Sequence, residues 1–443
     1  MTRIKKTLEQ PTPVQTSNIQ LPTGDLVPGE VAPGKKILPK LHRIAQIFGY
    51  DRVEPSPIEA LDSFGQHEEL LALSPDKYVR LDSPHGKRVG LRPQNFLGVL
   101  RAYTTHHVSE RERMTKWYYI EPAFAQDKTA LTHLYEFGLV NFGEASSVSD
   151  AHMIMTLRHL LQEFAIPGIV FEINSKGCES CGPYYEEVLS RFLQENKFDL
   201  CQDCQQLIRG DSKISEIVSH NLLSVLSCAR EECQTVTVGA PQIIDYLDAA
   251  CNKQLTALLE TLDELEVNYQ LNPRLFGSPR HSHTLFKIKI QPSIAGEAEI
   301  DLGTGGRVTR FVGKIAGQPI HTLHYSLPLQ ALYELIAQHG AEQKYDHTAD
   351  VFLINLGDLA AKKSLRLFQE LLRNDISVAE HFGENGIKNQ FKLAEKRGCL
   401  LALLIGQKEA LEGNVILRDV RSGIQEVFAS DRILEEVRKR LQD

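Results

Sequence analysis

Clustered cysteines restrict the possible folds of this sequence more than any other feature. Seven of its eight cysteines crowd one segment, and Cys399 stands alone. Cys178 and Cys181 form one C-x2-C pair, Cys201 and Cys204 form another, and 19 residues separate the pairs. Two intervening residues let both sulfurs of a turn reach one ion about 2.3 Å away, and paired knuckles of this kind are typical of structural zinc. We therefore predict that Cys178, Cys181, Cys201 and Cys204 bind one zinc ion.

Buried free thiols and disulfides are the alternatives for these pairs. The basic residues near the start are followed by a polar, Pro-containing stretch rather than an apolar one, so no secretion signal is indicated. Disulfides are therefore disfavoured. Cys228, Cys233 and Cys251 are expected to be packing thiols.

Length and composition indicate a globular protein of several domains. The chain has 443 residues, of which 42% are apolar and 24% charged. At about 150 residues per domain, two to three domains are expected. The longest apolar run, Cys399 to Gly406, is the size of a strand and well short of the roughly 18 residues of a membrane helix. We expect a cytoplasmic protein with no membrane partner.

Net charge limits how the chain can meet nucleic acid. Its formal charge is −8, so any RNA contact must come from a local basic patch. Lys388, Lys392 and Lys396 recur every four residues along a predicted helix, and Arg397 follows. Such a stripe is usually a solvated face, but it is also what contact with an RNA backbone requires.

Hydrophobic patterning predicts an α+β protein. Antiparallel strands separated by helices describe a core that is interrupted by the cysteine-bearing segment. Near the C-terminus, strand and helix alternate as in a small α/β layer. The expected divisions are a mobile tail over 1–20, a core over 21–172 and 266–338, a zinc-bearing insertion over 173–265, and an α/β domain over 349–443.

Two further motifs favour structural interpretations. Leu302 to Arg307 is rich in glycine, but no P-loop lysine follows, so a tight strand connection is expected rather than a phosphate cradle. His281 and His283 have no carboxylate or cysteine at ligand spacing, so ordinary solvated histidines are expected.

Several segments, in order along the chain, resemble histidyl-tRNA synthetase, a family of class II aminoacyl-tRNA synthetases. The resemblance runs from about Leu21 to Asp443. It is carried by Ser56 to Glu59 (motif 1), Leu91 to Pro93, Trp117 to Phe124 (motif 2), Asn174 to Cys204, Asn272 to Leu275, and Ile387 to Lys396.

The resemblance implies a fold and partners. We expect an antiparallel class II sheet with helices, a Cys-rich helical insertion, a C-terminal anticodon-binding-type domain and a homodimer. It also implies tRNA or another structured RNA as partner, bound through Lys388, Gln390, Lys392, Lys396 and Arg397.

The departures from the family pattern fall where the chemistry takes place. Ala125 stands in place of the motif 2 arginine, with Asp127 in place of the glutamate after it, and Ala331 stands in place of the motif 3 arginine. Guanidinium groups at such positions neutralise phosphate charge as adenylate forms. Gln94 replaces the glutamate that holds the histidine amino group, which removes a hydrogen bond worth about 1.5–3 kcal/mol.

These losses predict a degenerate synthetase that binds RNA and does not use ATP. Arg280 is a candidate substitute for a lost arginine. If it serves as one, the chain is an active histidine–tRNA ligase with a rebuilt pocket. A third reading is a regulatory subunit of ATP phosphoribosyltransferase, although subunits of that kind lack the C-terminal domain kept here.

Overall fold

The computed structural model divides the chain into two compact units, Met1–Gly340 and Ala341–Asp443. It describes residues 28–60, 78–81, 88–126, 131–208, 224–226, 228–276, 278, 280–291, 299–339, 349–380 and 386–442. The predicted tail over 1–20 and Asp127 lie outside these residues. No helix within the described ranges is long and apolar enough to cross a membrane.

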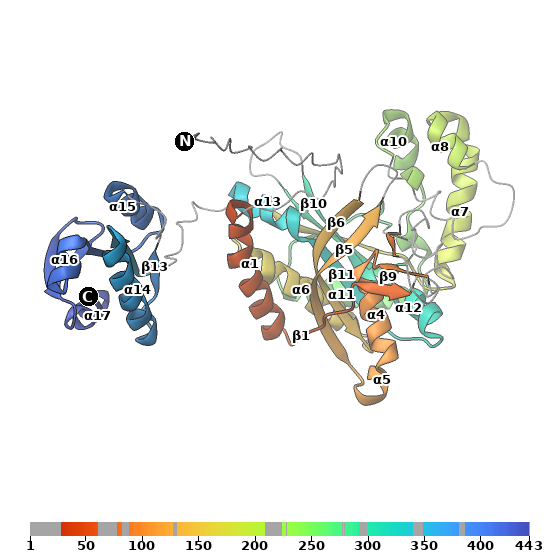
Figure 1. The fold of residues 1–443 in the computed structure, drawn as a ribbon. Coiled ribbons are helices and arrows are strands. Elements are labelled where there is room, and N and C mark those ends of the chain that lie inside the picture. Colours follow the sequence, from red (N-terminus) through yellow and green to blue (C-terminus); the bar gives the residue numbers. More distant parts are fainter. Residues whose placement is uncertain are drawn as a thin grey trace, which may run out of the picture. The chain divides into compact units, whose positions relative to one another are not determined.

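An eight-stranded sheet organises the first unit, in the order β1-β5-β6-β11-β10-β9-β7-β8 (Figure 1). Its neighbours run antiparallel except for β1 with β5 and β7 with β8. The strands are β1 (Asp51–Arg52), β5 (Thr115–Gln126), β6 (Leu131–Phe142), β7 (Ile169–Ser175), β8 (Tyr269–Leu271), β9 (Ser282–Ile290), β10 (Ile300–Arg307) and β11 (Thr322–Pro328). A small second sheet joins β2 (Ile58–Ala60), β4 (Val89–Leu91) and β3 (Arg80–Leu81).

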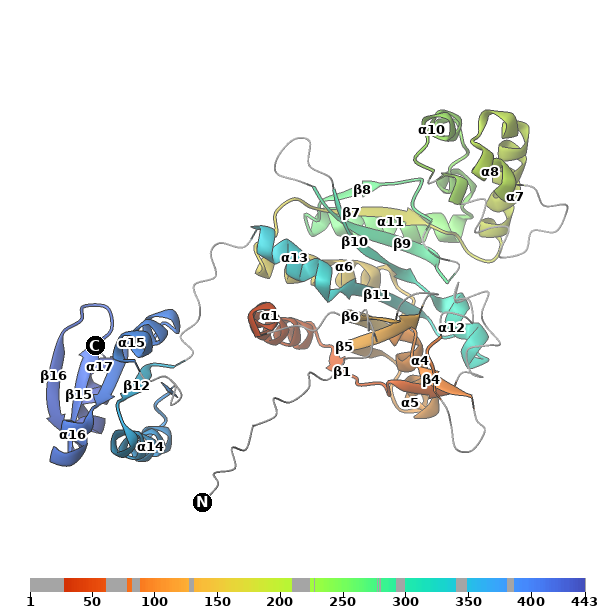
Figure 2. The ribbon, with the colours of Figure 1, turned by 45° about the horizontal axis from the view of Figure 1, so that its top comes forward.

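Helices cover both faces of the large sheet, as Figure 2 shows. Alternation along the strands sorts the core, because successive side chains point to opposite faces. Tyr118 and Leu139 pack in one apolar cluster, whereas Tyr119 and Val140 pack in another. The first cluster takes in α1 (Pro28–Ile47), α6 (Ser147–Glu163), α11 (Ala249–Glu264) and α13 (Leu329–His339). The second takes in α4 (Asn95–Thr105), α5 (Val108–Arg111) and α12 (Thr309–Ala316).

The glycine-rich segment over 302–307 is not a connection between strands. It lies inside β10, in the middle of the sheet. A Cβ at Gly305 would stand 2.6 Å from Phe286 Cζ and 2.8 Å from Tyr325 Cδ2. Glycine is therefore needed here because two neighbouring aromatic rings cover the strand.

The cysteine-rich insertion has its own apolar cluster. It comprises α7 (Cys181–Glu195), the 3-10 turn η2 (Lys197–Asp199), α8 (Gln202–Leu207), α10 (Glu231–Val238) and the 3-10 turn η3 (Ile243–Tyr246). Helix α11, which the sequence assigned to the insertion, packs instead in the main core. Its buried residues Leu255, Leu258 and Leu262 face that core at helical spacing, so the insertion ends before α11.

The second unit is a five-stranded sheet in the order β13-β12-β14-β15-β16. Strand β12 (Val351–Asn355) pairs in parallel with β13 (Val378–Glu380) and β14 (Leu401–Ile405), and β15 (Asn414–Asp419) and β16 (Gln425–Ala429) continue antiparallel. One face carries α14 (Asp358–Arg373), α16 (Gln407–Glu412) and α17 (Ile433–Gln442). The other carries α15 (Ile387–Lys396). The predicted α+β class, with its antiparallel sheet and C-terminal α/β domain, is confirmed.

Candidate active site and cysteine clusters

Gln94 and Arg280 meet at the beginning of α4. Gln94 takes the N-cap position after β4, with extended backbone and no side-chain bond to the helix. Its Oε1 is free to accept a hydrogen bond from Arg280 Nη1 at 2.6 Å, although 186 positions separate the two residues. A guanidinium bonded to this amide disfavours a second cation beside it, because two like charges repel at short range.

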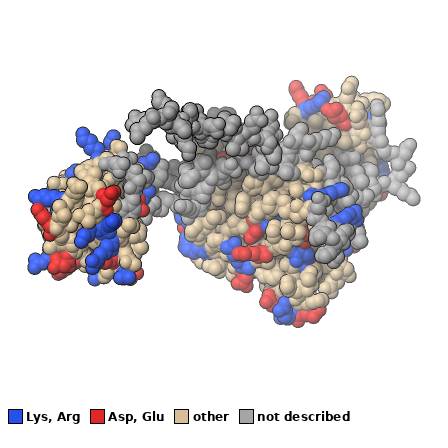
Figure 3. Space-filling view, in the orientation of Figure 1, with Lys and Arg blue, Asp and Glu red and all other residues tan. Residues whose placement is uncertain are grey.

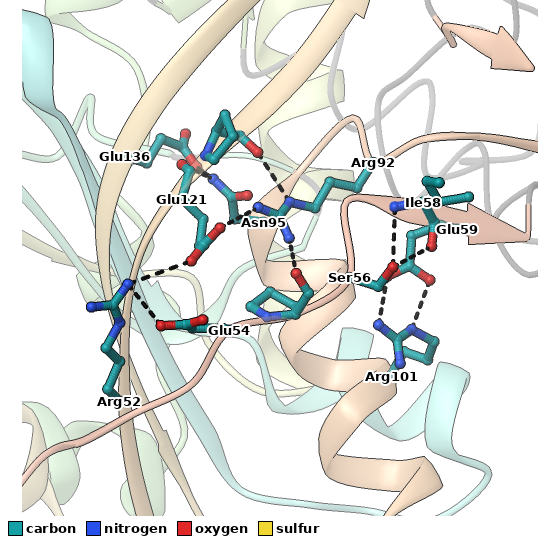
Figure 4. A network of polar contacts seen from close by, with 12 residues as sticks. Arg52, Glu54, Ser56, Ile58, Glu59, Arg92, Asn95, Arg101, Glu121 and Glu136 are labelled. Atoms are coloured by element: carbon teal, nitrogen blue, oxygen red, sulfur yellow. Dashed lines mark hydrogen bonds and ion pairs between the residues drawn. The ribbon is translucent and has the colours of Figure 1, made fainter.

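The half-buried carboxyl group of Glu136 lies close to this pair. Asn95 donates from Nδ2 to Glu136 Oε2 at 2.9 Å and to the Glu121 carbonyl at 2.9 Å. Burial raises the pKa of Glu136, against the opposing effects of the Asn95 bond and of the Arg280 and Arg92 charges. Figure 4 shows Asn95 between the two acidic residues. Glu136 is therefore a carboxyl group beside the Gln94–Arg280 pair that sequence reasoning missed.

Arg92 is fully buried and its donors are occupied by the protein itself (Figure 4). Its Nη2 contacts Glu121 Oε2 at 2.9 Å, its Nε donates to the Pro122 carbonyl at 3.0 Å, and its Nη1 donates to the Pro55 carbonyl. The Nε, Nη1 and Nη2 atoms of this planar guanidinium group are thus all bonded within the protein. It holds strand β5 against the segment before β2 and is not placed to neutralise a phosphate.

Arg307 is likewise engaged. It contacts both carboxylate oxygens of Asp150, at 2.7 and 3.0 Å, and donates to the carbonyls of Glu144 and Ser146. Thr284 Oγ1 donates to the same carboxylate at 2.6 Å. Arg307 thus ties β10 to α6.

The motif 1 segment carries a third tight pair. Glu59, in β2, is buried and faces Arg101 of α4 through two contacts at 2.7 and 2.8 Å. Both residues appear in Figure 4. The pair anchors α4, and with it Gln94, to the small sheet.

The two positions at which the sequence suggested a lost arginine lie on β5 and α13. Ala125 lies in β5 opposite Thr132 of β6, and Ala331 lies in α13 and packs against the main core. The residues of β5, β6 and α13 include no arginine. These three elements therefore carry no guanidinium group.

His281 is buried, so the prediction that it is solvated is wrong. Its side chain is bonded to Ser278, with 3.0 Å between Nδ1 and both the Ser278 nitrogen and Oγ. Burial, with the nearby Arg280 and Lys176 charges, lowers its pKa to about 3. A Cβ at Gly306 would lie 3.2 Å from His281 Cδ2, so the glycine of β10 makes room for the ring. Sequence spacing carries no sign of this contact.

Tyr119 and His324 form another interior contact that sequence reasoning missed. Tyr119 Oη and His324 Nε2 lie 3.1 Å apart, and the His324 ring lies 4.3 Å from the Phe96 ring. Burial, with the Arg280 and His281 charges, lowers the pKa of His324. Alternation along β11 gave no signal for this contact, because Leu323, His324 and Tyr325 are consecutive and all buried.

The two C-x2-C pairs do not form one site. Cys178 and Cys181 group with Cys251 and Asp248, whereas Cys201 and Cys204 group with Cys228 and Cys233. The predicted four-cysteine set is therefore replaced by two sets, and three cysteines expected to be packing thiols belong to them. The reason is α7, whose 15 residues span about 22 Å and keep the two pairs at opposite ends of the helix.

The insertion cluster, Cys201, Cys204, Cys228 and Cys233, has the chemistry of a zinc site. Its four sulfurs lie within 4.8 Å of one another. The Cys204 amide points at Cys201 Sγ and lowers the pKa of that thiol to about 7. Four soft donors of this kind fit tetrahedral zinc.

The lysine stripe is exposed but Gln390 is not. Lys388, Lys392 and Lys396 lie on the solvent face of α15. Gln390 is fully buried, where its amide accepts from the Asn355 nitrogen at 3.1 Å and donates to the Asn355 carbonyl at 2.9 Å. It was expected to contact RNA, but its side chain clamps β12 instead. Arg397 lies over the Phe352 ring, 5.8 Å from its centroid.

Comparison with models of protein families shows to which family this chain is related. The model of the family described as histidyl-tRNA synthetase matches residues 23–272, more than half of the chain. The chain belongs to the histidyl-tRNA synthetase family. The model described as an anticodon binding domain matches residues 350–440, which cover nearly the whole second unit.

Individual histidyl-tRNA synthetases match along almost the whole chain. The histidine–tRNA ligase of Caldicellulosiruptor bescii is 27% identical over 433 residues, covering 96% of this chain and 99% of that protein. The ligase of Dehalococcoides mccartyi is 26% identical over 427 residues, which cover 95% of this chain and 98% of that protein.

Solved structures share the fold. Apo histidyl-tRNA synthetase of S. aureus superposes with a TM-score of 0.74 at 21% identity, covering 94% of this chain and 97% of that one. A Bacillus halodurans C protein described as an ATP phosphoribosyltransferase regulatory subunit/histidyl-tRNA synthetase superposes with a TM-score of 0.61 at 14% sequence identity. The match covers 89% of this chain and 99% of that one. At these identities the likeness concerns architecture alone.

Proposed function

We propose that this member of the histidyl-tRNA synthetase family binds tRNA or another structured RNA and has lost the activation of histidine by ATP. The observation that carries the proposal is the 2.6 Å bond between Arg280 and Gln94. It puts a cation beside the position from which a carboxylate would hold the substrate amine. A histidine ammonium there would meet repulsion in place of a charge-assisted hydrogen bond.

The distribution of arginines supports the proposed loss of ATP-dependent activation. Ala125 and Ala331 stand where the family pattern has arginine, and the buried Arg92 and Arg307 are engaged with carboxylates and carbonyls. Each charge-stabilising donor typically supplies about 3–4 kcal/mol in a transition state. The loss of two such donors is expected to slow adenylate formation by roughly a thousandfold or more.

Histidine-dependent exchange of pyrophosphate into ATP tests this loss. We expect no exchange above the protein-free rate, with Arg280→Ala and the exposed control Arg191→Ala giving the same result. The proposal would be contradicted if the unaltered chain catalysed exchange, if Arg280→Ala abolished that exchange and if Arg191→Ala left it intact.

An active histidine–tRNA ligase is the second candidate, and Glu136 favours it. This half-buried carboxyl group accepts a hydrogen bond from Asn95 and interacts with the Arg280 charge, so it offers an alternative acceptor for a substrate amine. Under this candidate, Glu136→Gln lowers exchange as strongly as Arg280→Ala does. If histidine binds in calorimetry without exchange or RNA binding, a regulatory role like that named for the Bacillus halodurans relative becomes the better reading.

RNA binding is assigned to the exposed stripe of α15. Lys388, Lys392 and Lys396 share one helical face, as spacing of four residues requires. Figure 3 shows Lys and Arg spread over the visible face of the second unit with Asp and Glu between them, so the stripe is a local patch rather than part of a wholly basic surface.

Gel shift with tRNA tests this assignment. Changing Lys388, Lys392 and Lys396 to Glu is expected to weaken binding by about tenfold or more, because three phosphate contacts become repulsive. The matched control changes the exposed Lys362, Lys363 and Lys439 to Glu, with the same loss of charge in the same unit. Equal weakening by both triples would show a net-charge effect and remove the stripe from the proposal.

Zinc and a homodimer complete the proposal. The insertion cluster would hold zinc as a purely structural ion, fixing α8 to α10. Light scattering on the full chain tests the dimer, which is expected from the family resemblance.

A further inference from the structure

A second group of metal-ligating side chains lies where the insertion joins the core. Cys178 precedes α7 and Cys181 is its first residue, whereas Asp248 caps α11 and Cys251 lies in its first turn. Seventy positions separate each contacting pair. Two helix beginnings therefore bring three thiols and a carboxylate together, and nothing in the proposed function uses them.

The spacing of these atoms suits a single ion. Cys178 Sγ lies 3.5 Å from Cys181 Sγ and 3.0 Å from Asp248 Oδ2, and Cys181 Sγ lies 3.7 Å from Cys251 Sγ. Ligands about 2.3 Å from a tetrahedral zinc have sulfurs about 3.8 Å apart. The sulfurs thus already stand at the separation that zinc sets, and no backbone movement is needed.

The surrounding backbone is shaped to hold sulfur. Gly177 has φ +68°, and a Cβ there would stand 2.7 Å from Cys181 Sγ, so glycine clears the space that this sulfur fills. The amides of Cys178 and Ser180 point at Cys181 Sγ and Cys178 Sγ, at 3.2 and 3.3 Å. Outer-shell bonds of this kind orient ligands and favour their charged form.

Asp248 serves two purposes at once. Its Oδ1 accepts from the Cys251 amide at 2.8 Å and so caps α11. Its Oδ2 is left facing Cys178. The capping bond fixes the carboxylate while its second oxygen remains available as a ligand, and carboxylate oxygen is an ordinary zinc donor.

We infer that Cys178, Cys181, Asp248 and Cys251 bind a second zinc ion, separate from the one proposed for the insertion cluster. This junction site fastens the beginning of α7 to α11, a helix of the main core. It also fixes the wall of a cavity of about 1080 Å³, which is lined by Cys178, His283 and Arg310 among others. The inference is independent of whether the chain activates histidine.

Metal analysis of the full chain, purified under reducing conditions, tests the inference. We expect two zinc ions per chain, one after Cys251→Ser, and one after Cys228→Ser, which removes a ligand of the insertion cluster alone. Cys399→Ser is the matched control, since this thiol is buried in the second unit and belongs to neither group. The inference would be overturned if the unaltered chain contained a single zinc ion and the Cys251→Ser variant still contained that ion.

Cobalt substitution keeps the test decisive if Cys251→Ser fails to fold. Asp248→Asn preserves a capping side chain but removes the charged ligand. We expect it to shift the cobalt d–d bands of one of two sites, whereas the bands of the insertion cluster stay unchanged. An unaltered cobalt spectrum, or a Cys178–Cys181 disulfide found by mass spectrometry in place of metal, would contradict the junction site.

Discussion

At the scale of single residues, burial rather than residue type decides chemistry in this protein. Gln94 and Arg280 were each singled out from the sequence, but nothing in the sequence indicated that the two side chains bond to each other. His281 stands in a loop rich in serine and proline but is enclosed by β10. Each of these outcomes depends on a partner far away in the chain, which no local pattern encodes.

His281 predicts a measurable pH dependence of stability. Its pKa is about 3 in the folded protein and about 6.5 when unfolded, so its contribution is complete above pH 6.5 and is lost as the pH falls toward 3. Between pH 7 and pH 5 the free energy of unfolding should fall by about 2 kcal/mol through this residue.

Urea unfolding at both pH values measures the effect. His281→Gln keeps a hydrogen-bonding side chain but does not titrate in this range, so it should show a smaller loss between pH 7 and pH 5 than the unaltered chain. The exposed His106→Gln is the control and should behave as the unaltered chain does. An equal pH effect in all three proteins would contradict the burial of His281.

At the scale of elements, buried polar side chains fasten neighbouring helices and strands to one another. Arg307 joins β10 to α6, Arg92 joins β4 to β5, and Gln390 joins α15 to β12. Patterning predicted the strands and helices but not these clamps. A buried polar residue looks the same in sequence as a solvated one, because helical spacing reports the apolar face and leaves the polar positions open.

Gln390 gives a prediction for one such clamp. Gln390→Leu leaves the nitrogen and carbonyl of Asn355 without their partner, which should destabilise the end of β12 by about 2 kcal/mol. Amide hydrogen exchange in β12 should then run about thirtyfold faster. Lys388→Leu, on the exposed face of the same helix, is the control. Unchanged protection in Gln390→Leu would show that the clamp carries no stability.

At the scale of the whole molecule, an acidic protein is proposed to bind a polyanion. The net charge of −8 opposes RNA at long range, so affinity must come from close phosphate contacts. The proposal therefore requires strong salt dependence that maps to one helix.

The salt slope tests this requirement on the intact chain. Each phosphate contact contributes about 0.7–0.9 to the slope of log K against log salt concentration. Changing Lys388, Lys392 and Lys396 to Glu should reduce the slope by about 2, whereas the Lys362, Lys363 and Lys439 triple should leave it nearly unchanged. A slope that is the same in all three proteins would place the RNA elsewhere.

The order of motifs and the periodicity along the chain were enough to predict the family and the α+β class, and both predictions are confirmed. The loss of two arginines, which rests on the same motifs, stays a prediction. The tertiary structure decided which cysteines share a site, because α7 holds its two ends apart while Asp248 and Cys251 return from 70 positions away. It also moved α11 into the core and Gln390 into the interior. Spacing in sequence limits which neighbours are reachable, but packing of distant elements selects among them.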